Sequence, residues 1–331
     1  MKRVHSLLSV ASLSLAAAAP AAPAPDQSVP APAPAAEGED GVVLGYDSDR
    51  FERMTVPVSI DGKGPFRFIV DTGAERTVIA REVAENLDLD SAGPVRMHSM
   101  TEVSDIDTVA ISDLDVGGKR VSAINAPALE QRHLGADGML GVDSLQSQRV
   151  SFDFQREQMT VSASRKKAEY WPPDTIVVTA KNRFGRLVLI DASVEGQKVW
   201  VIIDTGSQAT IGNLALRRKL EKRHRLRELK PVELLSVTGG RMMANQTLIH
   251  RIRLGDVDIE QLPVAFADAH PFRKLDLLDR PALLLGMDAL RLFERVSVDF
   301  PNRRVRLLAT PRAVIGPPPR MAAASGARPG G

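Results

Sequence analysis

Residues 68–79 read FIVDTGAERTVI, and residues 201–207 read VIIDTGS. In both stretches three apolar residues lead into Asp-Thr-Gly. Other blocks recur in the same order around each copy. They are RF at 50–51 and 183–184, DVG at 115–117 and RLG at 253–255, MLG at 139–141 and LLG at 284–286, and RVSFDF at 149–154 and RVSVDF at 295–300. The shared order indicates that one structural unit has been duplicated within the chain.

Each half reads mainly as short strands separated by turns. Apolar residues alternate at 56, 58 and 60 before Asp61-Gly62, and similar hairpin turns are expected at 117–118, 195–196 and 255–256. Helical patterns are confined to 80–87, 214–229 and 289–293. The sequence therefore predicts an all-β fold of two pseudo-symmetric β-barrel lobes with few short helices.

The ends of the chain differ in composition from this duplicated body. Lys2 and Arg3, the apolar run 7–19 and the small residues 16–18 predict a signal peptide at 1–19, with an uncleaved anchor as the alternative. Residues 20–41 and 311–331 read as a disordered Pro/Ala-rich spacer and a disordered tail. We expect the lobes at 42–164 and 175–310, with a linker at 165–174. The protein would then be exported, either to the periplasm or outside the cell.

Composition excludes several classes of function. The net charge is only +2 and aromatic residues are few, which argues against nucleic-acid binding. The chain has no cysteine, so it has neither disulfides nor a thiol nucleophile. The six histidines lack ligand spacing, and we expect no metal and no cofactor. A basic run at 217–227 reads as a solvated helix face, with contact to an anionic membrane or an acidic substrate as the alternative.

The Asp-Thr-Gly motifs carry the chemistry. Each Asp follows a buried strand, where desolvation favours the protonated acid. If Asp71 and Asp204 face each other they share one proton, so one carboxylate can act as a general base toward water and the other as a general acid. The alternative, that each Asp only caps a turn, leaves the pairing of the motifs unexplained.

The same segments resemble aspartic proteases. Residues 71–79 resemble the active-site segment of retropepsins, the retroviral-type enzymes, and 204–207 resemble the pepsin-family variant. Residues 138–143 and 282–288 resemble the second signature of that family, in which two apolar residues precede a glycine that packs beneath the catalytic loop. The resemblance spans both repeats and implies one β-barrel lobe per repeat with the substrate cleft between the lobes. Because both halves lie in one chain, we expect a monomer.

The resemblance also implies roles for individual residues. Asp71 and Asp204 would be catalytic. The catalytic-loop residues would be Thr72, Gly73, Ala74, Thr205, Gly206 and Ser207, and the second-signature residues Leu140, Gly141, Leu285 and Gly286. The flap tips over the substrate would comprise Ser99, Met100 and Thr101 in the first half and Val237, Thr238, Gly239 and Gly240 in the second. The first tip lacks glycine, which puts its mobility in question, and ordinary exposed hairpins are the alternative.

One difference between the motifs suggests an asymmetric pair. Ser207 follows one Asp-Thr-Gly, whereas Ala74 follows the other. A hydroxyl at 207 that donates to the Asp204 carboxylate would favour its charged form. The sequence then predicts that Asp204 holds the negative charge and Asp71 the proton.

The sequence as a whole predicts an aspartic endopeptidase that cleaves exported or periplasmic polypeptides by means of an activated water. The alternatives are a catalytically inactive peptide-binding module that uses the same cleft, and a structural protein that uses only the β-fold.

Overall fold

The computed structural model describes residues 41–45, 47–48, 53–145, 147–164, 172, 175–183, 186–189 and 191–309. The predicted signal peptide, the tail, the spacer up to residue 40 and nearly all of the linker lie outside these ranges, as do Phe51 and Phe184. Gly41, which we assigned to the spacer, begins the first described strand. No helix in the described ranges is long and apolar enough to cross a membrane.

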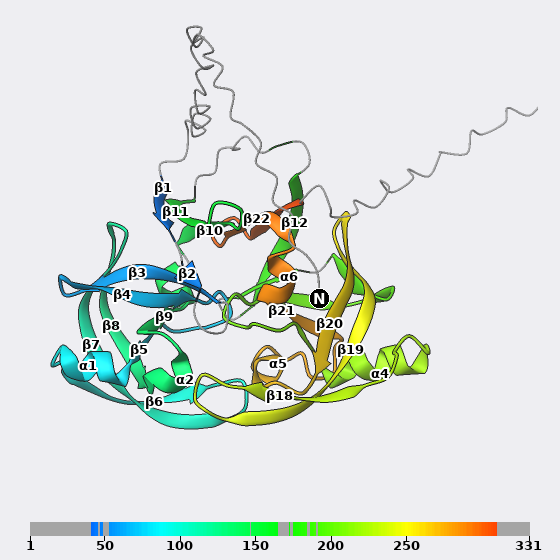
Figure 1. Cartoon of the computed structure of the whole chain (residues 1–331), viewed down its shortest axis with the longest axis horizontal. Coiled ribbons are helices and arrows are strands. Elements are labelled where there is room, and N and C mark those ends of the chain that lie inside the picture. The colour runs from blue at the N-terminus through cyan, green and yellow to red at the C-terminus, as the bar shows by residue number, and fades with distance from the viewer. Residues whose placement is uncertain are drawn as a thin grey trace, which may run out of the picture. The chain divides into compact units, whose positions relative to one another are not determined.

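The first half of the chain forms a sheet in the order β2-β3-β4-β9-β5-β8-β7-β6 (Figure 1). Its strands are β2 (Asp47–Ser48), β3 (Met54–Ile60), β4 (Lys63–Val70), β5 (Val78–Ala80), β6 (Ser91–His98), β7 (Val103–Val116), β8 (Lys119–Leu129) and β9 (Gly138–Leu140). Between or after them lie α1 (Arg81–Asn86), α2 (Gln131–Leu134) and α3 (Val142–Leu145). β3 also pairs with β7, which closes the sheet into a barrel. We call this half lobe one.

The second half repeats this arrangement as lobe two. Its strands are β13 (Arg186–Leu189), β14 (Ala192–Val194), β15 (Gln197–Lys198), β16 (Trp200–Ile203), β17 (Ile211–Gly212), β18 (Lys230–Leu235), β19 (Arg241–Leu254), β20 (Val257–Phe266) and β21 (Ala282–Leu285). Its helices are α4 (Leu214–Lys222), α5 (His270–Lys274) and α6 (Met287–Leu290). β16 runs parallel to β21, and β17 parallel to β20, as β4 does to β9 and β5 to β8.

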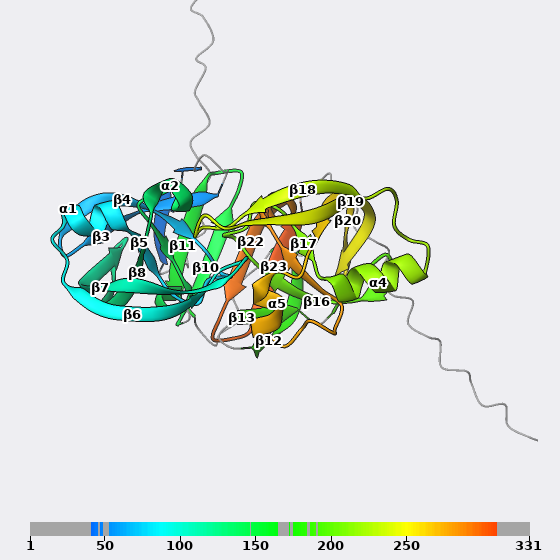
Figure 2. The ribbon, with the colours of Figure 1, turned by 90° about the horizontal axis from the view of Figure 1, so that it is seen from below.

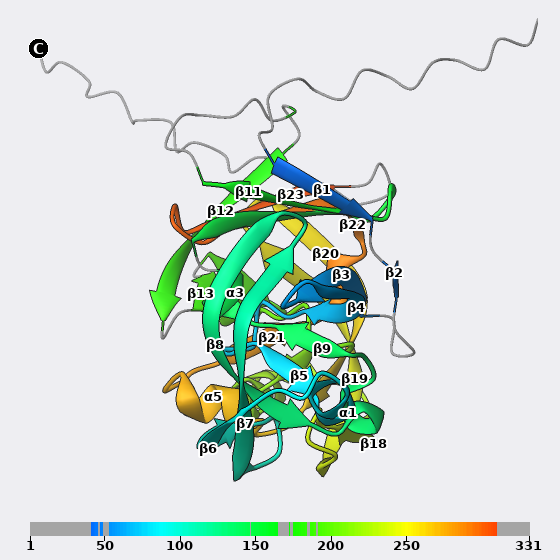
Figure 3. The same cartoon turned by 90° about the vertical axis from the view of Figure 1, so that its left-hand side faces the viewer.

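A central sheet joins the two lobes and continues into lobe two, because its last strand pairs with β13 (Figure 3). Its order is β1 (Gly41–Gly45), β11 (Gln158–Ala163), β10 (Gln148–Asp153), β22 (Phe293–Asp299), β23 (Arg304–Ala309) and β12 (Thr175–Arg183). β10 and β22 pair antiparallel with Ser151 opposite Ser297, and the two hydroxyl oxygens lie 2.9 Å apart. The two lobes are therefore tied together by main-chain hydrogen bonds.

Tight hairpin turns separate neighbouring strands in both lobes. Asp61 and Gly62 have φ angles of 48° and 76°, and Glu195 and Gly196 repeat these values in lobe two. Two successive left-handed residues make the hairpin turn whose twist matches that of the flanking strands. These turns lie where the sequence predicts them.

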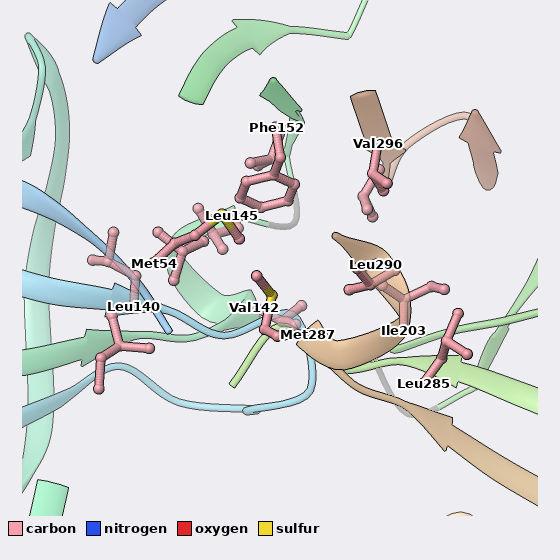
Figure 4. Packing of buried hydrophobic residues seen from close by; sticks show 14 of the residues in the cluster. Met54, Leu140, Val142, Leu145, Phe152, Ile203, Leu285, Met287, Leu290 and Val296 are labelled. Carbon is pink, nitrogen blue, oxygen red and sulfur yellow. The ribbon is translucent and has the colours of Figure 1, made fainter. Parts of the chain in front are cut away.

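Buried apolar side chains from both lobes and the central sheet form one cluster beneath the two Asp-Thr-Gly loops (Figure 4). Leu140 and Val142 come from lobe one, Leu285 and Met287 from lobe two, and Phe152 from the central sheet. All five are at most 3% exposed. This cluster spans both lobes, and a second, smaller cluster is formed by buried residues of lobe two, among them Ile202 and Leu284.

The helices depart from expectation in several places. α2, α3 and α5 form where no helix was predicted. The helix predicted at 214–229 ends at Lys222, because His224 has a φ of 51°, a left-handed conformation that breaks the helix. Phe293, placed at the end of a predicted helix, instead begins β22, where it is buried. The expectation of an all-β, two-lobe fold with few short helices is confirmed.

The Asp153 carboxylate lies at the junction of β10 and β22. Burial alone would raise its pKa, but hydrogen bonds from the Arg156 backbone and side chain and from Arg295 lower the pKa below its ordinary value. A carboxylate with a lowered pKa stabilises the folded state above its ordinary pKa, and this stabilisation is lost as the pH falls through the lowered value.

We therefore expect Asp153→Asn to lower the free energy of unfolding by about 1–3 kcal/mol at pH 7. The difference from wild type should shrink below about pH 4, as the wild-type carboxyl also becomes neutral. Urea denaturation across this pH range tests the prediction. Glu221→Gln is the control, because Glu221 forms an exposed pair with Arg217 on α4, and its loss should cost at most about 0.5 kcal/mol.

Candidate active site

Two parallel strand pairs position the Asp-Thr-Gly motifs. Asp71 follows the end of β4 and Asp204 follows the end of β16. The Asp71 N–H donates to Leu140 O (3.0 Å), and the Asp204 N–H donates to Leu285 O (3.1 Å). Each aspartate is therefore held by a second-signature residue of its own lobe.

The two carboxyl groups have equivalent surroundings. Asp71 Oδ1 accepts hydrogen bonds from the backbone N–H groups of Gly73 (2.7 Å) and Ala74 (2.9 Å). Asp204 Oδ1 accepts from those of Gly206 (3.2 Å) and Ser207 (3.1 Å). In each lobe, one carboxyl oxygen is thus fixed by its own loop.

Each carboxyl group also lies against the opposite motif. A Cβ added to Gly73 would lie 2.6 Å from Asp204 Cγ, and one added to Gly206 would overlap the Asp71 carboxyl group. No side chain fits at either position, so glycine is required there by the approach of the other lobe. The geometry brings the two aspartates together at the lobe interface.

Two threonines lock the loops to each other across the interface. Thr72 N–H donates to Thr205 Oγ1 (3.0 Å), and Thr205 Oγ1 donates to Val70 O (2.6 Å). Reciprocally, Thr205 N–H donates to Thr72 Oγ1 (3.3 Å), which donates to Ile203 O (3.0 Å). Both threonines are at most 3% exposed. We call this arrangement the threonine lock.

A second pair of threonines secures the far end of each loop. Thr77 donates through its N–H and hydroxyl to Asp143, and Thr210 donates in the same way to Asp288. Burial raises the pKa of the Asp288 carboxyl, although hydrogen bonds from Thr210 act to lower it. We did not assign a role to these residues from the sequence, but a signal exists: a threonine stands six residues after each catalytic-motif Asp.

The second-signature glycines lie directly beneath the loops. A Cβ at Gly286 would lie 2.6 Å from the carbonyl carbon of Ala209, and one at Gly141 would overlap the carbonyl group of Arg76. The loops therefore rest on these glycines, as the sequence predicts. Leu140 and Leu285 are buried in the core instead of lining the site.

The Ser207 side chain does not lie as the sequence predicts. Its hydroxyl donates to Ala209 O (2.8 Å), so its proton is used within the loop. Ser207 instead donates its backbone N–H to the Asp204 carboxylate, as Ala74 does to the Asp71 carboxylate. The hydroxyl therefore does not supply the expected asymmetry between the aspartates.

A cleft of about 430 Å³ opens above the two aspartates. Ten of its lining residues are Asp71, Gly73, Ala74, Ser99, Met100, Asp204, Gly206, Ser207, Ser236 and Val237. β6 and β18 also line it, and both strands lie on the side of the molecule seen in Figure 2. Both lobes therefore contribute to one cleft. Of the predicted flap residues, Ser99, Met100 and Val237 line it, whereas Thr101, Thr238, Gly239 and Gly240 do not.

The flaps are the hairpin tips between β6 and β7 and between β18 and β19. Ser99 closes the first tip by accepting from Glu102 N–H (3.1 Å) through its hydroxyl. In the second tip Gly239 has a φ of 86° and donates to Ser236 O (2.9 Å). The first tip turns without glycine, whereas the second uses one in the left-handed region.

Each flap tip contacts the opposite lobe. Gly239 packs on the His133 ring of α2, with 2.6 Å between the ring and an added Cβ, and Gly240 packs on Thr101 of the other tip. At the first tip Met100 O accepts from His270 N–H (2.9 Å). His98 Nδ1 also lies 2.5 Å from His270 Nε2, and the two rings stack. We identified neither His133 nor His270 from the sequence, because their partners lie more than 100 residues away.

The surroundings of His270 disfavour the protonated form of its imidazole. Burial lowers the pKa of the His270 imidazole, and the neighbouring His98, Arg273 and Lys274 lower it further. Among the described residues, no group of three or more metal-binding side chains could hold an ion.

Comparison with known proteins agrees with this geometry. No curated protein matches the chain. The aspartyl protease family model matches it twice, at residues 56–144 and 190–289, which together are more than half of the sequence. Each match contains one Asp-Thr-Gly loop and the glycine beneath it, and the pair of matches accounts for the duplication. The protein is thus a member of the aspartyl protease family, with two copies of the family's domain in one chain.

Proposed function

We propose that this protein is an aspartic endopeptidase in which Asp71 and Asp204 act together on one water molecule. The observation that carries the proposal is that each carboxyl group lies against the glycine of the opposite motif. Two carboxyl groups held so near each other share one proton, because both cannot ionise at low cost. The pair then offers one base and one acid at the same place.

The reaction follows from this shared proton. The ionised carboxylate takes a proton from water, whose oxygen attacks the carbonyl carbon of the peptide. The protonated carboxyl gives its proton to the carbonyl oxygen, so a tetrahedral intermediate forms without a covalent bond to the protein. When the C–N bond breaks, the amine leaves with the proton that came from water, and the carboxyl group that lost its proton recovers one from the intermediate.

The surrounding hydrogen bonds support this chemistry. Two backbone N–H groups hold Oδ1 of each aspartate, which fixes the orientation of both carboxyl groups at the cleft. The threonine lock fixes the separation of the loops, and a misplacement of about 1 Å can cost on the order of a hundredfold in rate.

The cleft suits an extended polypeptide that contacts both lobes. Within the part of the chain that the structure describes, β6 pairs only with β7 and β18 only with β19, and both line the cleft. One chain supplies both aspartates, so we infer that a monomer suffices. We further propose that the substrates are exported or periplasmic polypeptides, since residues 1–19 read as a signal peptide.

Replacing either aspartate should abolish catalysis. We expect Asp71→Asn and Asp204→Asn each to lower kcat for casein cleavage by at least about a thousandfold, because the pair loses its base or its acid. Thermal unfolding shows whether the variants remain folded, and Glu221→Gln on α4 serves as the active control. Cleavage by Asp71→Asn at the wild-type rate, or a folded wild type inactive at both acid and neutral pH, would favour a peptide-binding module instead.

Removing one hydroxyl of the threonine lock should weaken both stability and activity. Thr72→Val keeps the shape but leaves Ile203 O and Thr205 N–H without their partner. We expect a loss of about 1–3 kcal/mol in unfolding free energy and a lower kcat. Thr72→Ser keeps the hydroxyl and should restore most of both quantities. Equal behaviour of the valine and serine variants would show that the hydroxyl is unimportant.

Export predicts a processed N-terminus. Expressed in a bacterium with its full sequence, the protein should be recovered outside the cytoplasm without residues 1–19. Cell fractionation and the intact mass of the purified protein test this. Retention of Met1 in a cytoplasmic fraction would contradict export.

A further inference from the structure

The duplication allows each residue of the cleft to be compared with its counterpart in the other lobe. On the flap strands, Arg96 stands three residues before the buried Ser99, and Glu233 stands three residues before the buried Ser236. In the catalytic loops, Arg76 stands five residues after Asp71, and Ala209 five residues after Asp204. All four positions line the cleft. Arg96 and Glu233 therefore occupy equivalent positions, as do Arg76 and Ala209, but the side chains of each pair differ in charge.

Arg76 is held rigidly but keeps its charge exposed. Gly141 packs under its carbonyl group, and the next residue, Thr77, is bound by Asp143. Its side chain is exposed, and no ion pair of Arg76 is found among the described residues. The neighbouring Glu75 already pairs with Lys274 of α5 across the lobe interface. The backbone of Arg76 is therefore fixed, and its exposed guanidinium is available to a ligand in the cleft.

Arg96 and Glu233 have weak partners. Arg96 lies 3.5 Å from Asp105, with side chains 73% and 66% exposed. Glu233 lies 2.9 Å from Arg241, with side chains 44% and 68% exposed. Exposed pairs of this kind contribute little free energy, so a substrate charge can compete for either residue. The cleft is also lined by Arg53, which donates to Leu134 O, and by the paired Glu75 and Lys274. Apart from these, the lobe-one wall presents Arg76 and Arg96, whereas the lobe-two wall presents Ala209 and Glu233.

The two walls differ in charge at these counterpart positions. The loops that hold the aspartates make the same backbone hydrogen bonds in both lobes. An extended peptide could gain similar main-chain contacts in either direction along such a cleft. Opposite charges at counterpart positions remove this ambiguity, because a charged side chain on the peptide is favoured on one wall and repelled by the other.

We propose that Arg76 and Arg96 select peptides that carry an acidic side chain on one side of the cleaved bond, and that Glu233 disfavours the same peptide in the reverse direction. This inference rests on the proposed function only for the position of the cleaved bond. The substrates are peptides with an acidic side chain near the cleaved bond, and the guanidinium of Arg76 binds the carboxylate of that side chain.

The test uses one cleavable peptide with Glu, Gln or Lys at each of three positions on either side of the cleaved bond. At pH 6, where a substrate Glu is ionised, kcat/KM should favour Glu over Gln by about tenfold, on one side only. Arg76→Ala, which copies the lobe-two residue, should lower this ratio, and the Arg76→Ala, Arg96→Ala double variant should bring it near one. Arg76→Glu should reverse it in favour of Lys. Arg218→Ala on α4 is the matched control and should leave the ratio as in wild type.

Binding separates this inference from the proposed function. The same peptides are titrated by fluorescence anisotropy into Asp71→Asn and into the Asp71→Asn, Arg76→Ala double variant. Preference for Glu that is lowered by the loss of Arg76 supports the inference even if the wild type cleaves nothing, in which case only the proposed function fails. Equal binding of Glu and Gln peptides, or an equal preference on both sides of the bond, overturns the inference whether or not the protein is a protease.

Discussion

The contact of each aspartate with the glycine of the opposite motif is the constraint on which the rest of the structure depends. Asp71 occupies the space that a side chain at 206 would need, and Asp204 does the same at 73. The threonine lock holds this approach with hydrogen bonds buried from water, where they are strongest and costly to leave unmade. The clamp of Thr77 on Asp143 and the glycines beneath the loops serve the same approach from within each lobe.

The central sheet also holds the two lobes in a fixed position relative to each other. β10 and β22, which are equivalent strands of the two repeats, pair in one ladder with Ser151 opposite Ser297 near its middle. The core beneath the loops is shared, because Phe152 of this sheet packs in the same cluster as Leu140 and Leu285. A shift of one lobe against the other would break strand pairing, core packing and the threonine lock together.

Much of this could be predicted from the sequence because repeats and turns are local signals. The order of the blocks revealed the duplication, and Asp-Thr-Gly after an apolar strand indicated the site. What could not be predicted depends on contacts between distant segments. The Ser207 hydroxyl turns to Ala209 O, and His133 and His270 receive the flap of the other lobe. The end of α4 was also missed, because the apolar spacing of Leu226 and Leu229 reflects packing on the core and not a helical face.

The linkage of both lobes within a single polypeptide has a consequence for how the site is assembled. When two separate subunits must meet to build a site, the assembled fraction falls on dilution and each subunit is constrained to carry the same residues. Here the second lobe is always present at the high local concentration set by the connecting chain. Assembly is thereby insensitive to protein concentration, and each copy is free to mutate alone, which is how an arginine and an alanine can occupy counterpart positions around the same pair of acids.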